Sequence, residues 1–208
     1  MTDLRYEIAK DLLEIKAVEL RPQPENYFTW TSGIQSPIYC DNRLTMSYPS
    51  VRNRIAAGLV AIIQSRYPEV TVIAGTSTAG IPHAAWVSDR LDLPMVYVRD
   101  SKKKHGKTNQ IEGKIGAHDK VVVIEDLIST GISSLKVVEA LSERGAQVLG
   151  VVAIFSYSLS KTMDTFIQKG IQVDTLTQYD ILVEVAQQSG YIQEEEIETL
   201  IQWRNQLD

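Results

Sequence analysis

The sequence contains little cysteine and little histidine. One cysteine, Cys40, and three histidines stand among 208 residues, so the chain cannot form an internal disulfide and offers no zinc-ligand spacing. No stretch approaches the roughly 18 apolar residues of a membrane span, and residues 1–10 alternate acids and bases where a signal peptide has an apolar region. We therefore expect a protein of the reducing cytoplasm with no membrane anchor.

An excess of positive charge is also absent. Lys and Arg total 21 against 26 Asp and Glu, a formal net charge of −5, which argues against a general nucleic-acid or anionic-membrane binder. Hydrophobic residues make up 44% and charged residues 23%, close to globular averages, and we find no internal repeat or low-complexity tract. The length predicts one domain, or one domain with an appendage.

Strand and helix patterns alternate through the middle of the chain. Four apolar runs have the length of buried strands: residues 70–74, 95–98, 121–124 and 148–155. A helical pattern over residues 49–66 precedes the first run, and helical patterns at residues 82–89 and 133–144 lie between later runs. Strands that are apolar on both faces and separated by helices predict an α/β fold with a doubly wound, mainly parallel sheet.

The two ends of the chain have different patterns. Apolar residues recur at helical spacing from Leu4 to Val18, which predicts an amphipathic helix that ends before Pro22. Residues 27–30 and 36–40 follow as two expected short strands. After the last apolar run we expect a helix, a short strand and two terminal helices.

Two carboxylates follow the most apolar strand of the sequence. Residues 121–124 carry a buried strand to its carboxyl end, where open α/β sheets bind ligands, and Glu125 and Asp126 come next. The hydroxyl-rich turn 129–134 then presents backbone N–H groups at a helix start, with Gly131 relieving crowding, which suits a phosphate. Acids beside a phosphate fit a ligand with vicinal hydroxyls or a magnesium ion.

Two plainer interpretations of this segment remain in view. In one, the acids are solvated residues at the sheet edge before an ordinary capped helix. In the other, the apolar run before acids is the second motif of a nucleoside triphosphatase, but that class also requires G-x-x-x-x-G-K-[ST], which the sequence lacks.

A long basic loop separates two of the expected strands. From Arg99 to Lys114 there are six basic and two acidic residues, a formal charge of +4. Because the whole chain has a net charge of −5, the rest of the chain carries −9. A solvated loop is the commonest fate of such a run. Its length, polarity and position favour a lid that closes over a polyanion and excludes water.

A second strand-to-helix turn has a similar composition. Residues 74–82 are small and rich in hydroxyls, and their backbone N–H groups suit a second phosphate. A simple connecting turn is the alternative.

Together these segments resemble the type I phosphoribosyltransferases, whose signature matches residues 121–133. Among them the chain is similar to the orotate phosphoribosyltransferases, because residues 28–43 resemble their base-side segment and residues 99–113 their catalytic loop. The resemblance implies three parts: an N-terminal helix and base-binding hood over residues 1–46, an α/β core over residues 47–180, and C-terminal helices over residues 181–208 packed on the same domain.

The resemblance also implies a reaction. It is the magnesium-dependent transfer of a phosphoribosyl group from phosphoribosyl pyrophosphate (PRPP) to orotate, giving orotidine 5′-phosphate and pyrophosphate in de novo pyrimidine (UMP) biosynthesis. PRPP and water would hold most of the Mg²⁺ coordination, with no direct metal ligand from the protein. In this family the loop reaches the neighbouring subunit's site, which implies a homodimer with shared active sites and no nucleic-acid or membrane partner.

Matching positions assign the implied roles. The catalytic residues would be Lys103, His105 and Asp126. The PRPP-binding residues would be Arg99, Lys103, His105, Glu125, Asp126, Leu127, Ile128, Ser129, Thr130, Gly131, Ile132, Ser133, Thr76, Ser77, Thr78, Ala79 and Gly80. Orotate would lie against Ser129 and Phe28.

Four positions depart from the family pattern. Ile132 stands where the signature usually has a second small residue. Thr31 and Ala79 stand where one branch has lysines, and Asp100 follows the loop arginine where that branch has a basic residue. The change at Ile132 removes no charged contact, but the other three leave the orotate carboxylate and the pyrophosphate with fewer cations; those at Thr31 and Ala79 resemble another bacterial branch.

Two further functions compete with this one. A regulatory protein with the same fold would keep the binding site and lose catalysis, but Lys103, His105, Glu125 and Asp126 are retained here, and we expect no DNA-binding extension. A purine phosphoribosyltransferase would keep the signature and lack the segment 32–43.

Overall fold

The computed structural model describes residues 3–30, 33–99 and 110–207, and its centre is a six-stranded sheet. The strands are β5 (Val72–Thr76), β6 (Met95–Val98), β7 (Ile111–Glu112), β8 (Lys120–Ile128), β9 (Gln147–Ser156) and β10 (Gln172–Gln178). They lie in the order β10-β9-β8-β5-β6-β7, and all neighbours are parallel except β6 and β7. The mainly parallel sheet predicted from the sequence is confirmed.

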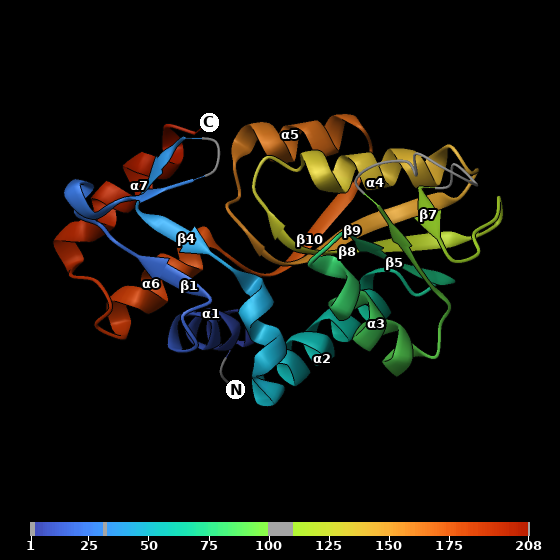
Figure 1. The fold of residues 1–208 in the computed structure, drawn as a ribbon, viewed down its shortest axis with the longest axis horizontal. Helices are drawn as coiled ribbons and strands as arrows, with labels where there is room; N and C mark the ends of the chain where they lie inside the picture. Colours follow the sequence, from blue (N-terminus) through green and yellow to red (C-terminus); the bar gives the residue numbers. More distant parts are fainter. Residues whose placement is uncertain (1–2, 31–32, 100–109, 208) are drawn as a thin grey trace.

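Helices cover both faces of this sheet (Figure 1). The helices of the described residues are α1 (Leu4–Glu14), α2 (Pro49–Arg66), α3 (Gly80–Leu91), α4 (Ile132–Ser142), α5 (Ser160–Gln168), α6 (Tyr179–Gln188) and α7 (Ile197–Asn205), of which α7 lies beside the N-terminal strands. Helices α4 and α5 lie on one face, and α2 and α3 lie on the other. The buried apolar residues accordingly form two clusters, one on each side of the sheet. Within the described ranges no helix is long and apolar enough to cross a membrane.

The N-terminal part adds two small antiparallel pairs beside the sheet. Strand β1 (Val18–Leu20) pairs with β4 (Ile38–Cys40), and β2 (Phe28–Thr29) pairs with β3 (Gln35–Ser36). Short 3₁₀ turns accompany these pairs and the C-terminal helices: η1 (Pro24–Asn26), η2 (Asn42–Ser47) and η3 (Glu194–Glu196).

The two ends of the chain pack against each other. The Trp203 indole on α7 donates a hydrogen bond to the Gln35 carbonyl at 3.0 Å, and its ring centroid lies 5.7 Å from that of Trp30. On α1, the Tyr6 hydroxyl donates to Glu184 on α6 at 2.8 Å. The C-terminal helices therefore support the β2–β3 hairpin, while the expected boundaries at residues 46 and 180 stay predictions.

Some boundaries differ from those expected. Helix α1 ends at Glu14, because Lys16 adopts a positive φ of 57° and Val18 then pairs with Cys40 as a strand. Strand β8 continues to Ile128, four residues beyond the apolar run, because Leu127 and Ile128 pair with the end of β9. The two acids that seemed to terminate the strand therefore lie within it.

Candidate active site

The carboxyl ends of β5 and β8 bring the two predicted phosphate turns to one edge of the sheet. These strands are neighbours, with Gly75 opposite Ile124. The turn from Thr76 to Gly80 therefore begins beside the strand that carries Glu125. The edge is thus formed by two strand-to-helix connections, the arrangement in which parallel α/β sheets bind ligands.

Gly80 allows the start of α3 to approach β8 closely. A Cβ atom at this position would lie 2.5 Å from the carbonyl oxygen of Ile124. Such a distance is shorter than any real contact of this kind, so a side chain would push the helix away. Glycine therefore places the N-terminus of α3 directly beside the residue that precedes Glu125. Within this turn the Ser77–Thr78 peptide is cis.

The Glu125 side chain is buried and held from two directions. It is 4% exposed; the Ser134 hydroxyl donates to its Oε2 at 3.0 Å, and the Asp126 backbone N–H donates to its Oε1 at 3.1 Å. Burial raises the pKa of the Glu125 carboxyl, and the neighbouring Asp126 raises it further, while Ser134 lowers it. Its side chain is thus fixed before any ligand arrives.

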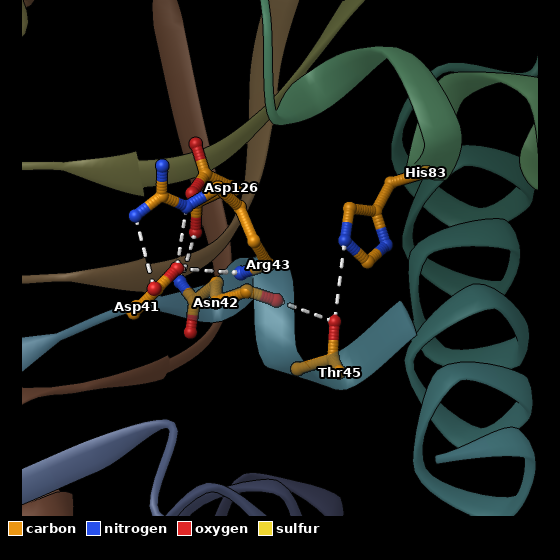
Figure 2. A network of polar contacts seen from close by, with 6 residues as sticks. All are labelled: Asp41, Asn42, Arg43, Thr45, His83 and Asp126. Carbon is orange, nitrogen blue, oxygen red and sulfur yellow. Dashed lines mark hydrogen bonds and ion pairs between the residues drawn. The ribbon is translucent and has the colours of Figure 1, made fainter. Parts of the chain in front are cut away.

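Asp126 lies next to a second, unpredicted network (Figure 2). Its backbone carbonyl accepts a hydrogen bond from Asn42 Nδ2 at 2.7 Å, and Asn42 is 1% exposed. Burial raises the pKa of the Asp126 carboxyl, while hydrogen bonds to Glu125 and to backbone N–H groups, and then the positive charge of Arg43, lower it. The η2 turn therefore holds the β8 backbone at the residue that carries a predicted catalytic carboxylate.

The same network extends to α3. The Thr45 hydroxyl donates to the Asn42 carbonyl at 2.6 Å, and His83 Nε2 lies 3.5 Å from that hydroxyl oxygen. Because the hydroxyl proton is already used, Nε2 is the donor in the His83 contact. Burial lowers the pKa of His83 to about 4, so the imidazole is neutral at pH 7. The network joins η2, β8 and α3.

The predicted phosphate-binding turn at residues 129–134 packs against α5. Gly131 is the N-cap of α4 with a φ of 71°, and a Cβ there would lie 2.7 Å from the Phe166 ring. Thr162 donates to the carbonyl of Ser129 at 2.9 Å. Ile132, which replaces a small residue of the family pattern, is 56% exposed. Contacts with α5 therefore fix the turn, and the free backbone N–H groups at the start of α4 follow it in the chain.

Arg99 lies at the edge of a cavity of about 300 Å³ beside α4. Its Nη1 lies 3.5 Å from Glu112 Oε1, and Ser133 and Lys136 line the same cavity. The structure therefore brings Arg99 towards the start of α4. The predicted catalytic residues Lys103 and His105 lie outside the described residues, as do Asp100 and Thr31.

Phe28 belongs to β2 in the N-terminal part of the chain. Its ring centroid is 5.5 Å from that of Tyr39, and the Arg21 guanidinium lies 4.0 Å above the ring. These contacts are made within the N-terminal part, so a position of Phe28 beside orotate stays a prediction.

Four supporting residues were not identified as site residues from the sequence: Asn42, Ser134, Thr162 and Phe166. Ser134 follows the motif directly, and its place in the first turn of a helix after buried acids was a usable signal. The other three come from distant segments, and no local pattern connects them to the motif.

Comparisons with known proteins show which proteins this chain is similar to. Residues 51–177 match the family model of the phosphoribosyl transferase domain. The chain is 61% identical over 204 residues to the orotate phosphoribosyltransferase of Fusobacterium nucleatum subsp. nucleatum, covering 98% of this chain and 97% of that protein. The structure of Leishmania donovani UMP synthase matches with a TM-score of 0.81 at 25% identity, over 97% of this chain and 42% of that one.

A further solved structure supports the fold alone. Orotate phosphoribosyltransferase from Aeropyrum pernix matches with a TM-score of 0.75 at 24% identity, over 89% of this chain and 99% of that chain.

Proposed function

This chain belongs to the orotate phosphoribosyltransferases, and from that premise we propose how its residues transfer a phosphoribosyl group from PRPP to orotate. The products are orotidine 5′-phosphate and pyrophosphate, in pyrimidine synthesis. The observation that carries the assignment of roles is the Glu125–Asp126 pair, which lies in β8 directly before the glycine-capped start of α4.

Glu125 and Asp126 hold the ribose hydroxyls of PRPP in this proposal. A carboxylate accepts hydrogen bonds from vicinal hydroxyls, and Ser134 and Asn42 fix the positions of the two acids beforehand. The turn from Ser129 to Ser133 holds the 5′-phosphate, because the N-terminus of α4 offers backbone donors and a favourable dipole. The backbone of Leu127 and Ile128 connects the two subsites.

The pyrophosphate end of PRPP lies between the turn Thr76–Gly80 and the basic loop. Displacement at the anomeric carbon leaves negative charge on the departing pyrophosphate, so cations placed there stabilise the transition state more than the substrate. We assign this role to Arg99, Lys103 and His105. Closure of the loop would also exclude water, which competes with orotate as the nucleophile.

The oxygen atoms at this edge of the sheet suit a magnesium ion, most of whose ligands PRPP would supply. Mg²⁺ prefers oxygen ligands and keeps several waters. Among residues 3–30, 33–99 and 110–207, no group of three or more His, Cys, Asp and Glu is gathered to hold a metal. Glu125 and Asp126 nevertheless place carboxyl oxygens at the ribose end. PRPP and water would hold the ion, which supplies positive charge to the leaving pyrophosphate.

Substrate dependence tests the proposed reaction. Purified protein should release pyrophosphate from PRPP only when both orotate and Mg²⁺ are present. Equal release with adenine, hypoxanthine or uracil in place of orotate would contradict the choice of base.

A homodimer that shares the basic loop between subunits is also proposed, in the cytoplasm. Lys103→Ala should greatly reduce turnover without unfolding the protein, and so should Asp126→Ala. If the loop of one subunit completes the site of the other, mixing the two variants restores part of the activity. Mixed dimers that form and stay inactive would show that each subunit has a self-contained site.

A further inference from the structure

Orotate carries a negatively charged carboxylate, and the two residues assigned to orotate, Ser129 and Phe28, offer no positive charge to it. Its carboxylate is attached to the carbon next to the ring nitrogen that bonds to ribose, so it approaches the anomeric carbon closely. Glu125 and Asp126 hold the ribose hydroxyls in our proposal, and a further carboxylate beside these acids is repelled unless a cation faces it. Thr31 stands where one branch of the family has a lysine.

Arg43 is a positively charged residue of the η2 turn, which contacts the strand that carries Asp126. Asp41 holds its guanidinium in a fork, with Nε 2.6 Å from Oδ1 and Nη2 2.9 Å from Oδ2. The residue between them, Asn42, donates to the Asp126 carbonyl at 2.7 Å. The fork is therefore fixed relative to the strand that carries the ribose-binding acids (Figure 2).

A second fork in the same chain provides an internal comparison. Asp3 and Arg5 have the same spacing, and Asp3 also caps a helix while its carboxylate accepts from Arg5 Nε at 3.1 and 3.0 Å. The Arg43 and Arg5 side chains are similarly accessible, 61% and 57% exposed. What distinguishes Arg43 is its position, because the adjacent residue Asn42 hydrogen-bonds to the Asp126 carbonyl, whereas Arg5 lies at the start of α1.

The fork leaves Arg43 able to bind a second anion. Asp41 takes hydrogen bonds from Nε and Nη2, and a guanidinium has five N–H donors, so Nη1 remains for a ligand. Because Asp41 already orders the side chain, binding costs less side-chain entropy than it would for a free arginine. A planar guanidinium also matches the geometry of a carboxylate.

We propose that Arg43 binds the carboxylate of orotate and thereby makes this chain select a carboxylated pyrimidine over an uncharged one. The inference rests on the proposed function, since it names the group that recognises the base-side substrate of that reaction.

The test compares two nucleotides that differ only in this carboxylate. Orotidine 5′-phosphate carries it and uridine 5′-phosphate lacks it, and the inhibition constant of each is measured against PRPP for the wild type, Arg43→Gln and Arg5→Gln. For Arg43→Gln we expect the constant for orotidine 5′-phosphate to rise about 10- to 100-fold, the range for a lost hydrogen bond between charged groups. The constant for uridine 5′-phosphate should change less than about twofold.

Two results would overturn the inference. An equal rise for both nucleotides would mean that Arg43 acts on the shared ribose phosphate or through Asp126, and no change for either would mean that it makes no contact. Arg5→Gln should leave both constants unchanged. If Arg43→Gln does not fold, Arg43→Lys keeps the charge without the fork, and it should raise only the constant for orotidine 5′-phosphate.

The outcome is separable from that of the proposed function. A wild-type protein without orotate-dependent release of pyrophosphate would contradict the proposed function. An active wild type whose preference for orotidine 5′-phosphate survives Arg43→Gln would contradict only the role of Arg43.

Discussion

Removal of the Asn42 side chain should damage both stability and PRPP binding. Asn42→Ala deletes the donor that lies 2.7 Å from the Asp126 carbonyl, at a residue that is 1% exposed. A buried carbonyl left without its donor costs about 1–3 kcal/mol, to which the small cavity adds. We therefore expect the free energy of unfolding to fall by about 2 kcal/mol. The Michaelis constant for PRPP should rise, because Asp126 is then less well positioned.

Urea unfolding measures the first effect and steady-state kinetics the second. The midpoint should shift without a change in the slope with urea concentration, which would show that stability rather than compactness changed. Asn53→Ala is the matched control: Asn53 Oδ1 accepts from Arg90 at 2.8 Å on the surface, and its loss should cost less than about 0.5 kcal/mol. An Asn42→Ala protein as stable as the control, with an unchanged constant for PRPP, would refute the proposed role of η2.

Three further predictions follow from buried contacts. Gly80→Ala places a Cβ 2.5 Å from the Ile124 carbonyl, so it should destabilise the fold by about 1–3 kcal/mol and weaken PRPP binding, whereas Gly116→Ala, with its nearest contact at 3.6 Å, should do neither. Because the folded-state pKa of His83 is about 4 against 6.5 ordinarily, the contribution of His83 to stability should fall by about 2 kcal/mol between pH 7 and 5. The raised pKa of Glu125 acts in the opposite direction, so the His83 part is the difference between wild type and His83→Asn in the change of urea midpoint between the two pH values; an identical change in both proteins would contradict the burial of a neutral imidazole. Trp203→Phe removes the 3.0 Å hydrogen bond to Gln35, and it should raise the Michaelis constant for orotate more than that for PRPP; equal changes would argue against support of the hairpin by α7.

Protonation of His83 favours the unfolded state. In the unfolded chain the imidazole binds a proton below pH 6.5, while in the folded chain it stays neutral until about pH 4. The unfolded state therefore binds more protons between these values, and acid favours it. Above pH 6.5 both states are neutral, so this group contributes no pH dependence there.

The motif residues could be predicted from the sequence, whereas the residues from distant segments that support them could not. The segment from Glu125 to Ser133 was predicted from one continuous pattern, because a strand, its two acids and the following turn are neighbours in the chain. Asn42 bonds to Asp126 across 84 positions, and Thr162 bonds to Ser129 across 33. No periodicity connects such pairs, since they meet only after the sheet and its flanking helices have formed.

The length of β8 illustrates the same limit at closer range. Two consecutive acids indicated the end of a strand, because carboxylates are costly to bury. The structure continues the strand to Ile128, since Leu127 and Ile128 pair with β9, and Ser134 hydrogen-bonds to the buried Glu125. Pairing with a neighbour and a specific hydrogen bond outweighed the local preference of the two acids.

From the sequence alone one obtains the α/β class, the basic loop, and the edge of the sheet at which ligand binding is predicted, because each depends on the order of residues within a short segment. The tertiary structure decided how the acids are held, which glycine lets α3 approach β8, and where Arg43 lies relative to Asp126. These features depend on segments far apart in the chain, and their energies come from burial and close packing, which exist only in the folded state.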